Sequence, residues 1–436
     1  MTRHRVAITR RRVAITGVGM VSPVGNDAAS SWANLRAGDS GIAEITHFDA
    51  SGFSTHIAAE VKNFDAAAVI PNRKLLKYAL PSHRFALGAA AEALADAGIR
   101  PTAGNGARWG LSVGAGMFNL AFDEFKKIAR YCAPESEFVS DGLLDPDFPL
   151  SPVTFCRGQT NTGLGLLAQH FGIEGYANCV HTACASGGQA IGAALRAMRR
   201  GLCDYALAGG FDSMIHPIGI SGFCLLGALS TDNDCPSRAS RPFDLTRNGF
   251  VLGEGAGFLV LEDWDAAKAR GAKIYAELAG NGDSLSCYRI TDSPPDGDGP
   301  IQAMRQAIAD AGITPAEIDY VNAHGTSTQM NDKSECAALN VVLAGRINEV
   351  PVSSTKSCMG HLIAAAGAVE AVVCALAVRD GIAPVNANFS QPDPECAVSL
   401  VTGESRPLRI RAALSNSLGF GGSNNSLVFR NPEEVR

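Results

Sequence analysis

Short apolar runs alternate with alanine-rich stretches along the whole chain, and this alternation predicts layered α/β structure. Strands are predicted at residues 13–17, 109–113, 205–209, 257–261, 274–278, 320–322 and 412–415. Helices are predicted at residues 28–35, 84–97, 186–200, 301–311 and 362–379, several of them followed by a glycine that favours a helix end. Residues 141–152 and 292–300 are rich in polar and turn-forming types and are predicted as surface loops.

Length and composition exclude disorder and favour a large folded core. The chain has 436 residues, of which 46% are hydrophobic and 18% charged. Asp and Glu (43) outnumber Lys and Arg (37), so the net charge of -6 has the wrong sign for general nucleic-acid binding. An acidic partner would therefore need a local basic patch.

Cysteine usage and apolar runs predict a cytoplasmic chain without a membrane span. The twelve cysteines include no C-x-x-C pair, so a disulfide framework or zinc ribbon is not expected. The N-terminus is basic and lacks a signal-peptide apolar core, and the longest apolar run, 362–378, is interrupted by Glu370. The pentapeptide RVAIT occurs at 5–9 and again at 12–16, and only the second copy runs on into Gly17-Val18-Gly19, which is expected to be a tight turn. Residues 1–11 are therefore expected to be a tail.

Two segments of similar pattern suggest that the chain consists of two related halves. HTACASGG at 181–188 opens one alanine-rich helix, and STKSCMGH at 354–361 opens another, and each helix ends in Arg and Gly. We expect an N-terminal half at 12–266 and a C-terminal half at 267–436, meeting around a shared site.

Three motif matches are weak. GLSVG at 110–114 matches a hydrolase elbow, but Ser112 lies within a strand pattern with no helix directly after it. GVGMVS at 17–22 lacks the third glycine of a dinucleotide fingerprint, and DGDG at 296–299 lacks the remaining ligands of a calcium loop. No His or Cys spacing matches a zinc site, so no catalytic metal is expected.

The sharpest chemical signal is Cys184, which stands between a predicted strand and a helix and is flanked by Ala, Ser and Gly. At a helix N-terminus, free N–H groups and the helix dipole are expected to lower a cysteine pKa and to stabilise an oxyanion. A buried structural cysteine is the alternative. His324, in VNAHGTST, and His361, in STKSCMGH, also follow predicted strands, where loops often carry function. One such histidine could be structural, but two together with a cysteine elbow indicate a catalytic site.

These motifs make the chain resemble the β-ketoacyl-acyl-carrier-protein synthases, most closely the synthase II type. The resemblance runs from VAITGVGMVSP at 13–23, through SRPFD at 240–244 and GFVLGEGAG at 249–257, to GFGGSN at 419–424. It implies the thiolase fold, with two βαβαβαββ halves forming five α-β-α-β-α layers. It also implies a dimer that acts on acyl carrier protein without a bound cofactor or metal.

The resemblance assigns roles to individual residues. Cys184 would carry the acyl group as a thioester, and His324 and His361 would stabilise the enolate formed when a malonyl group loses carbon dioxide. The N–H groups of Cys184 and Phe420 would form the oxyanion hole, and Phe420 would act as a gate. Lys356 and Glu370 would preorganise the site, although a surface ion pair is the alternative for each.

Further roles concern substrate delivery. Thr326 and Thr328 would bind the phosphopantetheine arm, and Met117, Phe118 and Leu418 would shape the acyl pocket. Arg73, Lys74 and Lys77 are the best candidate strip for docking an acidic carrier protein, although a solvated helix face is also consistent with them.

The pathway stays open between fatty-acid elongation and type II polyketide or polyene synthesis. Gly227, where the family often has a docking Arg, and Leu418, where it commonly has Phe, are departures that bear on this choice. A homodimer and a heterodimer with a chain-length factor are both possible. The alternative function is a non-catalytic chain-length subunit, but such partners lack the nucleophile. A degradative thiolase is disfavoured because no second cysteine occurs near 419–424.

Overall fold

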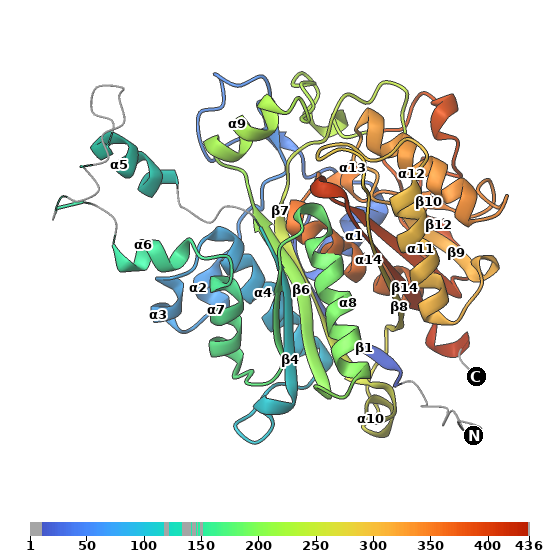
Figure 1. Ribbon diagram of the computed structural model, residues 1–436, viewed down its shortest axis with the longest axis horizontal. Coiled ribbons are helices and arrows are strands. Elements are labelled where there is room, and N and C mark those ends of the chain that lie inside the picture. Colours follow the sequence, from blue (N-terminus) through green and yellow to red (C-terminus); the bar gives the residue numbers. More distant parts are fainter. Residues whose placement is uncertain are drawn as a thin grey trace.

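The computed structural model describes residues 11–116, 122–132, 141, 145, 147–148 and 151–434, and these form a layered α/β structure (Figure 1). Ten strands form one mixed sheet: β1 (Val13–Val21), β4 (Trp109–Ala115), β5 (Ala177–Val180), β6 (Tyr205–Ser213), β7 (Glu254–Asp263), β8 (Ala276–Leu285), β9 (Ile318–Asn322), β10 (Val352–Ser353), β13 (Ala412–Leu418) and β14 (Ser423–Arg430). Two small sheets pair β2 (Ala43–Glu44) with β3 (Ile57–Ala58) and β11 (Ile382–Ala383) with β12 (Arg406–Pro407).

The described helices are α1 (Ala28–Ala37), α2 (Ala66–Val69), α3 (Arg73–Leu76), α4 (Pro81–Ala97), α5 (Phe122–Cys132), α6 (Pro152–Arg157), α7 (Thr162–Phe171), α8 (Ser186–Arg199), α9 (Pro217–Leu225), α10 (Trp264–Ala269), α11 (Asp298–Ala311), α12 (Gln329–Val342), α13 (Lys356–Met359) and α14 (Ala366–Asp380). No helix in the described part of the chain is both long and apolar enough to cross a membrane.

The large sheet consists of two five-stranded halves with the same internal order and the same strand directions. The strand order is β5-β4-β6-β7-β1 in one half and β10-β9-β13-β14-β8 in the other. In each half, the first three strands of this order are parallel to one another. Each of the last two strands is antiparallel to the strand before it. The halves join where β1 pairs briefly with β8. This repeated order confirms the predicted fold class of two related βαβαβαββ units.

Helices complete the five layers. α8 and α14 pack against each other and against strands of both sheet halves, so they form the central layer (Figure 1). α4 and α7 cover the outer face of the first half, and α11 and α12 cover that of the second. Every residue of α14 from Ala366 to Val378 is buried, which explains its nearly continuous apolar sequence.

Three local predictions were wrong. Gly17 and Gly19 lie inside β1 rather than in a tight turn, and a Cβ at these positions would lie 2.2 Å and 1.9 Å from carbonyl oxygens of α4. The two glycines therefore let α4 approach the strand closely. The predicted loop 292–300 ends early because α11 begins at Asp298, and the predicted helix 362–379 begins with a separate 3-10 turn, Ile363–Ala365.

Candidate active site

Cys184 lies in a tight turn between β5 and α8. The 3-10 turn Ala183–Ala185 precedes α8, and Ala183 adopts a left-handed φ of 49°. Gly187 and Gly188 lie in the first turn of α8, and a Cβ on Gly188 would lie 2.2 Å from Asn425 Oδ1. The small residues that follow the cysteine thus allow α8 to pack in the crowded centre of the molecule. Cys184 itself is buried.

The pKa of Cys184 is raised, whereas the sequence predicted that it would be lowered. Burial raises the pKa of this thiol to about 12, although the Lys356 charge and the backbone N–H groups of Phe420 and Cys184 act in the other direction. The sequence prediction included the pKa-lowering effect of the helix N-terminus. It could not include the desolvation, because burial depends on the tertiary structure. In this form of the site the sulfur is a thiol at neutral pH, so it must lose its proton as it reacts.

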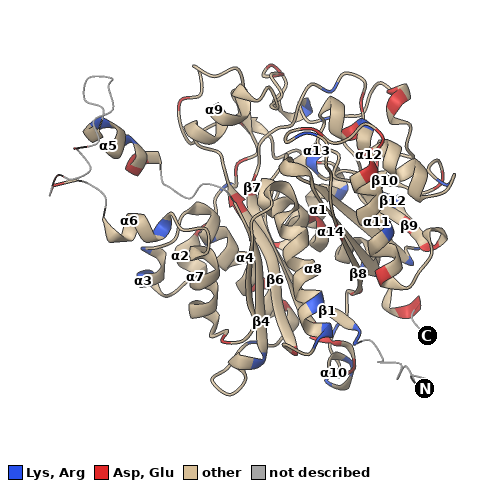
Figure 2. Ribbon diagram, in the orientation of Figure 1, with Lys and Arg blue, Asp and Glu red and all other residues tan. Residues whose placement is uncertain are grey.

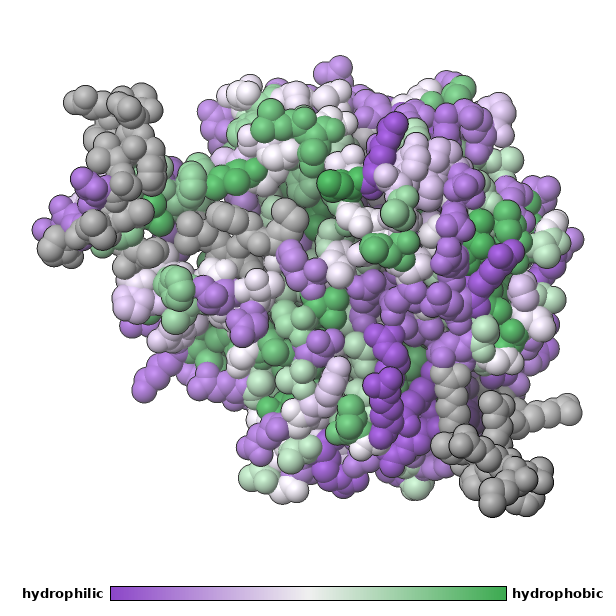
Figure 3. Space-filling view, viewed as in Figure 1, coloured by the Kyte–Doolittle hydropathy of each residue, from purple (hydrophilic) through white to green (hydrophobic). Residues whose placement is uncertain are grey.

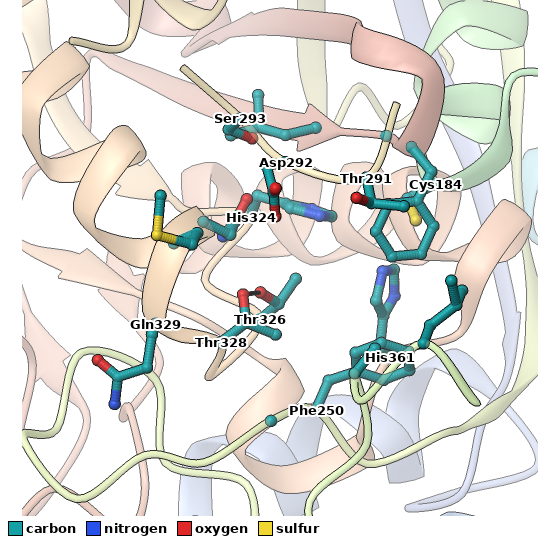
Figure 4. Close-up of a pocket in the computed structure, with 18 of the residues that line it drawn as sticks. Cys184, Phe250, Thr291, Asp292, Ser293, His324, Thr326, Thr328, Gln329 and His361 are labelled. Atoms are coloured by element: carbon teal, nitrogen blue, oxygen red, sulfur yellow. Dashed lines mark hydrogen bonds between the residues drawn. The ribbon is translucent and has the colours of Figure 1, made fainter. Parts of the chain in front are cut away.

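His324 and His361 converge on Cys184 from two other loops (Figure 4). His324 follows β9, and His361 follows α13. Their ring centroids are 5.2 Å apart at an interplanar angle of 83°. The ligand-forming atoms of Cys184, His324 and His361 all lie within 4.8 Å of one another. The predicted trio is therefore brought together from three distant segments of the sequence.

Both imidazoles are neutral and suited to hydrogen bonding. Burial and the Lys356 charge lower the pKa of His324 and of His361 well below the usual histidine range. The N–H of Ile363 donates to Nδ1 of His361 at 3.2 Å, so the ring proton is on Nε2.

The proton on Nε2 of His361 distinguishes metal binding from catalysis as the role of this site. Within the described chain, Cys184, His324 and His361 are the one group close enough to hold a metal ion. A metal-binding histidine normally donates its second ring nitrogen to an acceptor, whereas Nδ1 of His361 accepts. Because Nε2 of His361 carries the ring proton, this side chain is better suited to donate a hydrogen bond than to bind a metal.

Lys356 and Glu370 form an ion pair in the interior rather than on the surface. Lys356 Nζ contacts Glu370 Oε1, and both side chains are at most 2% exposed. Burial raises the pKa of Glu370 to about 7, with Lys356 opposing that shift. The pair is close enough to the histidines for the Lys356 charge to lower the pKa of both.

Sequence reasoning missed two residues that hold the histidines. The carboxylate of Glu335, on α12, accepts the N–H groups of His324 (2.9 Å) and Gly325 (2.8 Å) as well as Asn416 Nδ2 (3.0 Å). Phe250 packs edge-on against His361, with ring centroids 5.2 Å apart. An acidic residue at a buried position of a helix is a detectable signal for Glu335, and Phe250 lies within the motif GFVLGEGAG at 249–257, although that motif does not show its contact with His361.

A cavity of about 300 Å³ leads from the surface to this trio. Thr326 and Thr328 line it, and their hydroxyl oxygens are 2.9 Å apart. Leu418 at the end of β13 and Phe420 in the following loop also line it. Gly421 next to Phe420 has a φ of 80°, which favours glycine. Seven of the predicted site residues therefore share one cavity: Cys184, His324, His361, Thr326, Thr328, Leu418 and Phe420.

The rim of the cavity is partly apolar. Leu226 and Met330 line it, and Leu225 at the end of α9 is 87% exposed. Figure 3 shows apolar side chains gathered around α9.

The remaining predicted residues differ in where they lie. Arg73, Lys74 and Lys77 are exposed on and next to α3, away from the residues that line the cavity (Figure 2). Met117 and Phe118 lie outside the described residues. Gly227 lines the cavity.

Comparison with known proteins defines the class. Residues 10–267 match the β-ketoacyl synthase N-terminal domain family, and residues 275–390 match the β-ketoacyl synthase C-terminal domain family. This chain belongs to the β-ketoacyl synthase family.

Particular relatives match over nearly the full length. A 3-oxoacyl-[acyl-carrier-protein] synthase 2 of Vibrio harveyi is 42% identical over 426 residues, covering 97% of this chain and 99% of that protein. The corresponding protein of Coxiella burnetii is 40% identical over 421 residues, covering 96% and 98%. The ketosynthase structure described as "AntDE:AntF (apo): type II PKS acyl-carrier protein in complex with its ketosynthase bound to the hexaketide" is 31% identical with a TM-score of 0.86, covering 97% and 99%.

Proposed function

We propose that this protein is a condensing enzyme that joins an acyl group to a malonyl group, both delivered on acyl carrier protein. The observation that carries the proposal is the convergence of Cys184 with two neutral histidines at the inner end of an open cavity. A thiol can hold an acyl group covalently, and neutral imidazoles can donate hydrogen bonds to charge that develops only during reaction.

In the first step, Cys184 Sγ attacks the acyl thioester, and the proton of its thiol leaves with the departing carrier thiol. The N–H groups of Cys184 and Phe420 act on the reacting carbonyl, because both already point towards Sγ. The glycine-rich loop that carries Phe420 gives this residue room to move when the acyl chain enters.

In the second step, the malonyl group loses carbon dioxide and leaves an enolate. His324 and His361 donate hydrogen bonds to the enolate oxygen, and the enolate carbon attacks the carbonyl of the Cys184 thioester. The sulfur of Cys184 leaves as a thiolate and takes up a proton from water to restore the thiol. Lys356 and Glu370 preorganise the two imidazoles. Thr326 and Thr328 hold the phosphopantetheine arm through their hydroxyl groups.

We further propose how the chain is organised. The half at 12–266 carries the nucleophile, and the half at 267–436 carries both histidines. The reaction needs no cofactor beyond the group on the carrier protein, and because all twelve cysteines are free the protein works in a reducing cytoplasm. Arg73, Lys74 and Lys77 dock the acidic carrier protein.

A dimer is proposed along β5. This strand is the last of the large sheet and pairs with β4 on one side, so its other edge offers unpaired backbone groups within the described structure. A second copy or a related subunit could continue the sheet there. One similar structure is "The ishigamide ketosynthase/chain length factor", 33% identical with a TM-score of 0.85. The intact cysteine and histidines favour the catalytic role over that of a chain-length subunit.

Intact-protein mass spectrometry tests the proposal directly. The protein is incubated with carrier proteins that bear saturated or polyunsaturated chains, alongside the Cys184→Ala variant. We expect one acyl adduct per chain, absent in Cys184→Ala and retained in a matched Cys235→Ala control, because Cys235 is exposed and does not line the cavity. The preferred chain distinguishes fatty-acid from polyene substrates. An adduct that persists in Cys184→Ala would refute the assignment of the nucleophile.

A further inference from the structure

The two sheet halves bring two similar turns face to face at the centre of the molecule. The 3-10 turn Ala183–Ala185 leads into α8, and the 3-10 turn Ile363–Ala365 leads into α14. Their first residues share an unusual backbone conformation, with φ of 49° at Ala183 and 46° at Ile363. Ala364 therefore occupies the position in the second turn that Cys184 occupies in the first.

The backbone donors around the two turns also correspond. In the first turn, the N–H of Cys184 and that of Phe420, just after β13, point to the cysteine sulfur. In the second turn, the N–H of Ala364 donates to Asp212 Oδ2 at 3.0 Å, and the N–H of Ser213 donates to Asp212 Oδ1 at 2.8 Å. Asp212 and Ser213 end β6, which has the same place in its sheet half as β13 has in the other.

We propose that the Asp212 carboxyl group fills a second anion hole, built like the oxyanion hole of the active site, and thereby acts as a positioning residue for His361. This inference rests on the proposed enolate-stabilising role of His361. Two backbone donors face the reacting group at Cys184, and two backbone donors at the second turn face the carboxyl oxygens of Asp212.

The contacts explain how Asp212 would act on His361. Ile363 donates its N–H to the imidazole Nδ1, and the next N–H along the chain, that of Ala364, is the one held by Asp212. Ile363 is β-branched and left-handed, so this turn is strained and depends on its neighbours to persist. Without an acceptor, the buried N–H of Ala364 would favour a different backbone conformation, which would turn the imidazole.

The surroundings of Asp212 are shaped to the carboxylate. Asp212 is 3% exposed, and a Cβ on Gly116 would lie 2.1 Å from Oδ1. Burial, together with the nearby Glu254 charge, raises the pKa of Asp212 to about 7, whereas the Ala364 and Ser213 N–H groups favour the ionised form. The two backbone donors are thus the main contacts that stabilise the charge.

The test combines substitution with chemical rescue. Asp212→Ala removes the carboxylate and leaves a space into which formate fits, and Asp212→Asn keeps the shape but offers one acceptor for two donors. For each variant we would measure acylation of Cys184 by mass spectrometry and decarboxylation of malonyl carrier protein separately. We expect acylation within about twofold of the unsubstituted enzyme and decarboxylation reduced by about 10- to 100-fold in Asp212→Ala. Formate should restore decarboxylation at least fivefold in Asp212→Ala and should leave Asp212→Asn and the unsubstituted enzyme unchanged.

The outcomes separate this inference from the proposed function. If the unsubstituted enzyme shows neither acylation nor decarboxylation, the proposed function fails. If it shows both and Asp212→Asn decarboxylates malonyl carrier protein at the unsubstituted rate, Asp212 does not position His361. Parallel loss of acylation and decarboxylation in Asp212→Ala, without formate rescue, would also overturn the inference because it indicates a merely structural role. Should Asp212→Ala fail to fold, a selective loss of decarboxylation in Asp212→Asn supports the inference.

Discussion

The buried pair Lys356–Glu370 allows a quantitative test of how the interior of the site is stabilised. Removing one partner of a buried ion pair leaves a charge without compensation and costs about 3–5 kcal/mol, whereas replacing both partners is often neutral. We therefore expect Lys356→Met and Glu370→Gln each to destabilise the protein, and the double variant to regain most of the loss. Both side chains are almost fully buried, so solvent screening does not reduce the effect.

The expected change in melting temperature follows from chain length. At about 2.1 cal/mol/K of unfolding entropy per residue, a chain of 436 residues has about 0.9 kcal/mol/K in total. Each single substitution should therefore lower the melting temperature by about 3–5 °C, and the double substitution by less than about 2 °C.

The assay is thermal unfolding followed by fluorescence at one fixed protein concentration and pH 8. Burial raises the pKa of Glu370 to about 7, so its carboxyl group is ionised at pH 8. Because this pKa is raised on folding, the protonated carboxyl stabilises the folded protein at low pH, and that stabilisation is lost as the pH rises through 7. Lys126→Met is the matched control, because Lys126 pairs with Asp123 on the surface and should shift the melting temperature by less than about 1 °C. A double variant whose shift equals the sum of the two single shifts would refute the coupling.

Three further predictions concern the histidines, their support and the docking strip. Because the pKa values of His324 and His361 are lowered, their ring NMR signals should remain those of neutral imidazole from pH 8 down to pH 6, and a titration midpoint near 6.5 would contradict this. Glu335→Ala should impair malonyl decarboxylation and lower stability by about 2–5 kcal/mol, because buried donors lose their acceptor, and unchanged unfolding would show that other groups satisfy them. Charge reversal at Arg73 and Lys74 should raise the carrier-protein KM more than it lowers kcat, most strongly at low salt, and an unchanged KM would place docking elsewhere.

Much of the site could be predicted because its signals are local. Cys184 and His324 follow strands and His361 follows the short helix α13, and the neighbours of all three are small or polar residues suited to functional loops. The structure brings all three together. The protonation state of Cys184 could not be predicted, because desolvation depends on every segment that packs around the sulfur.

Contacts between distant segments explain the other differences. Gly17 and Gly19 have the composition of a turn, but their place opposite α4 makes them part of a strand. Glu335 and Asp212 are ordinary acidic residues in the sequence, and their backbone partners belong to other elements.

The amino-acid sequence by itself determined the alternation of strands and helices and the position of each reactive side chain along the chain, because hydrophobic periodicity and turn chemistry act over a few residues. The tertiary structure alone decided the burial of Lys356 with Glu370, the neutral state of the two histidines and the capture of the Ala364 N–H by Asp212. Burial and charge interactions depend on how the two sheet halves meet, which no local pattern encodes.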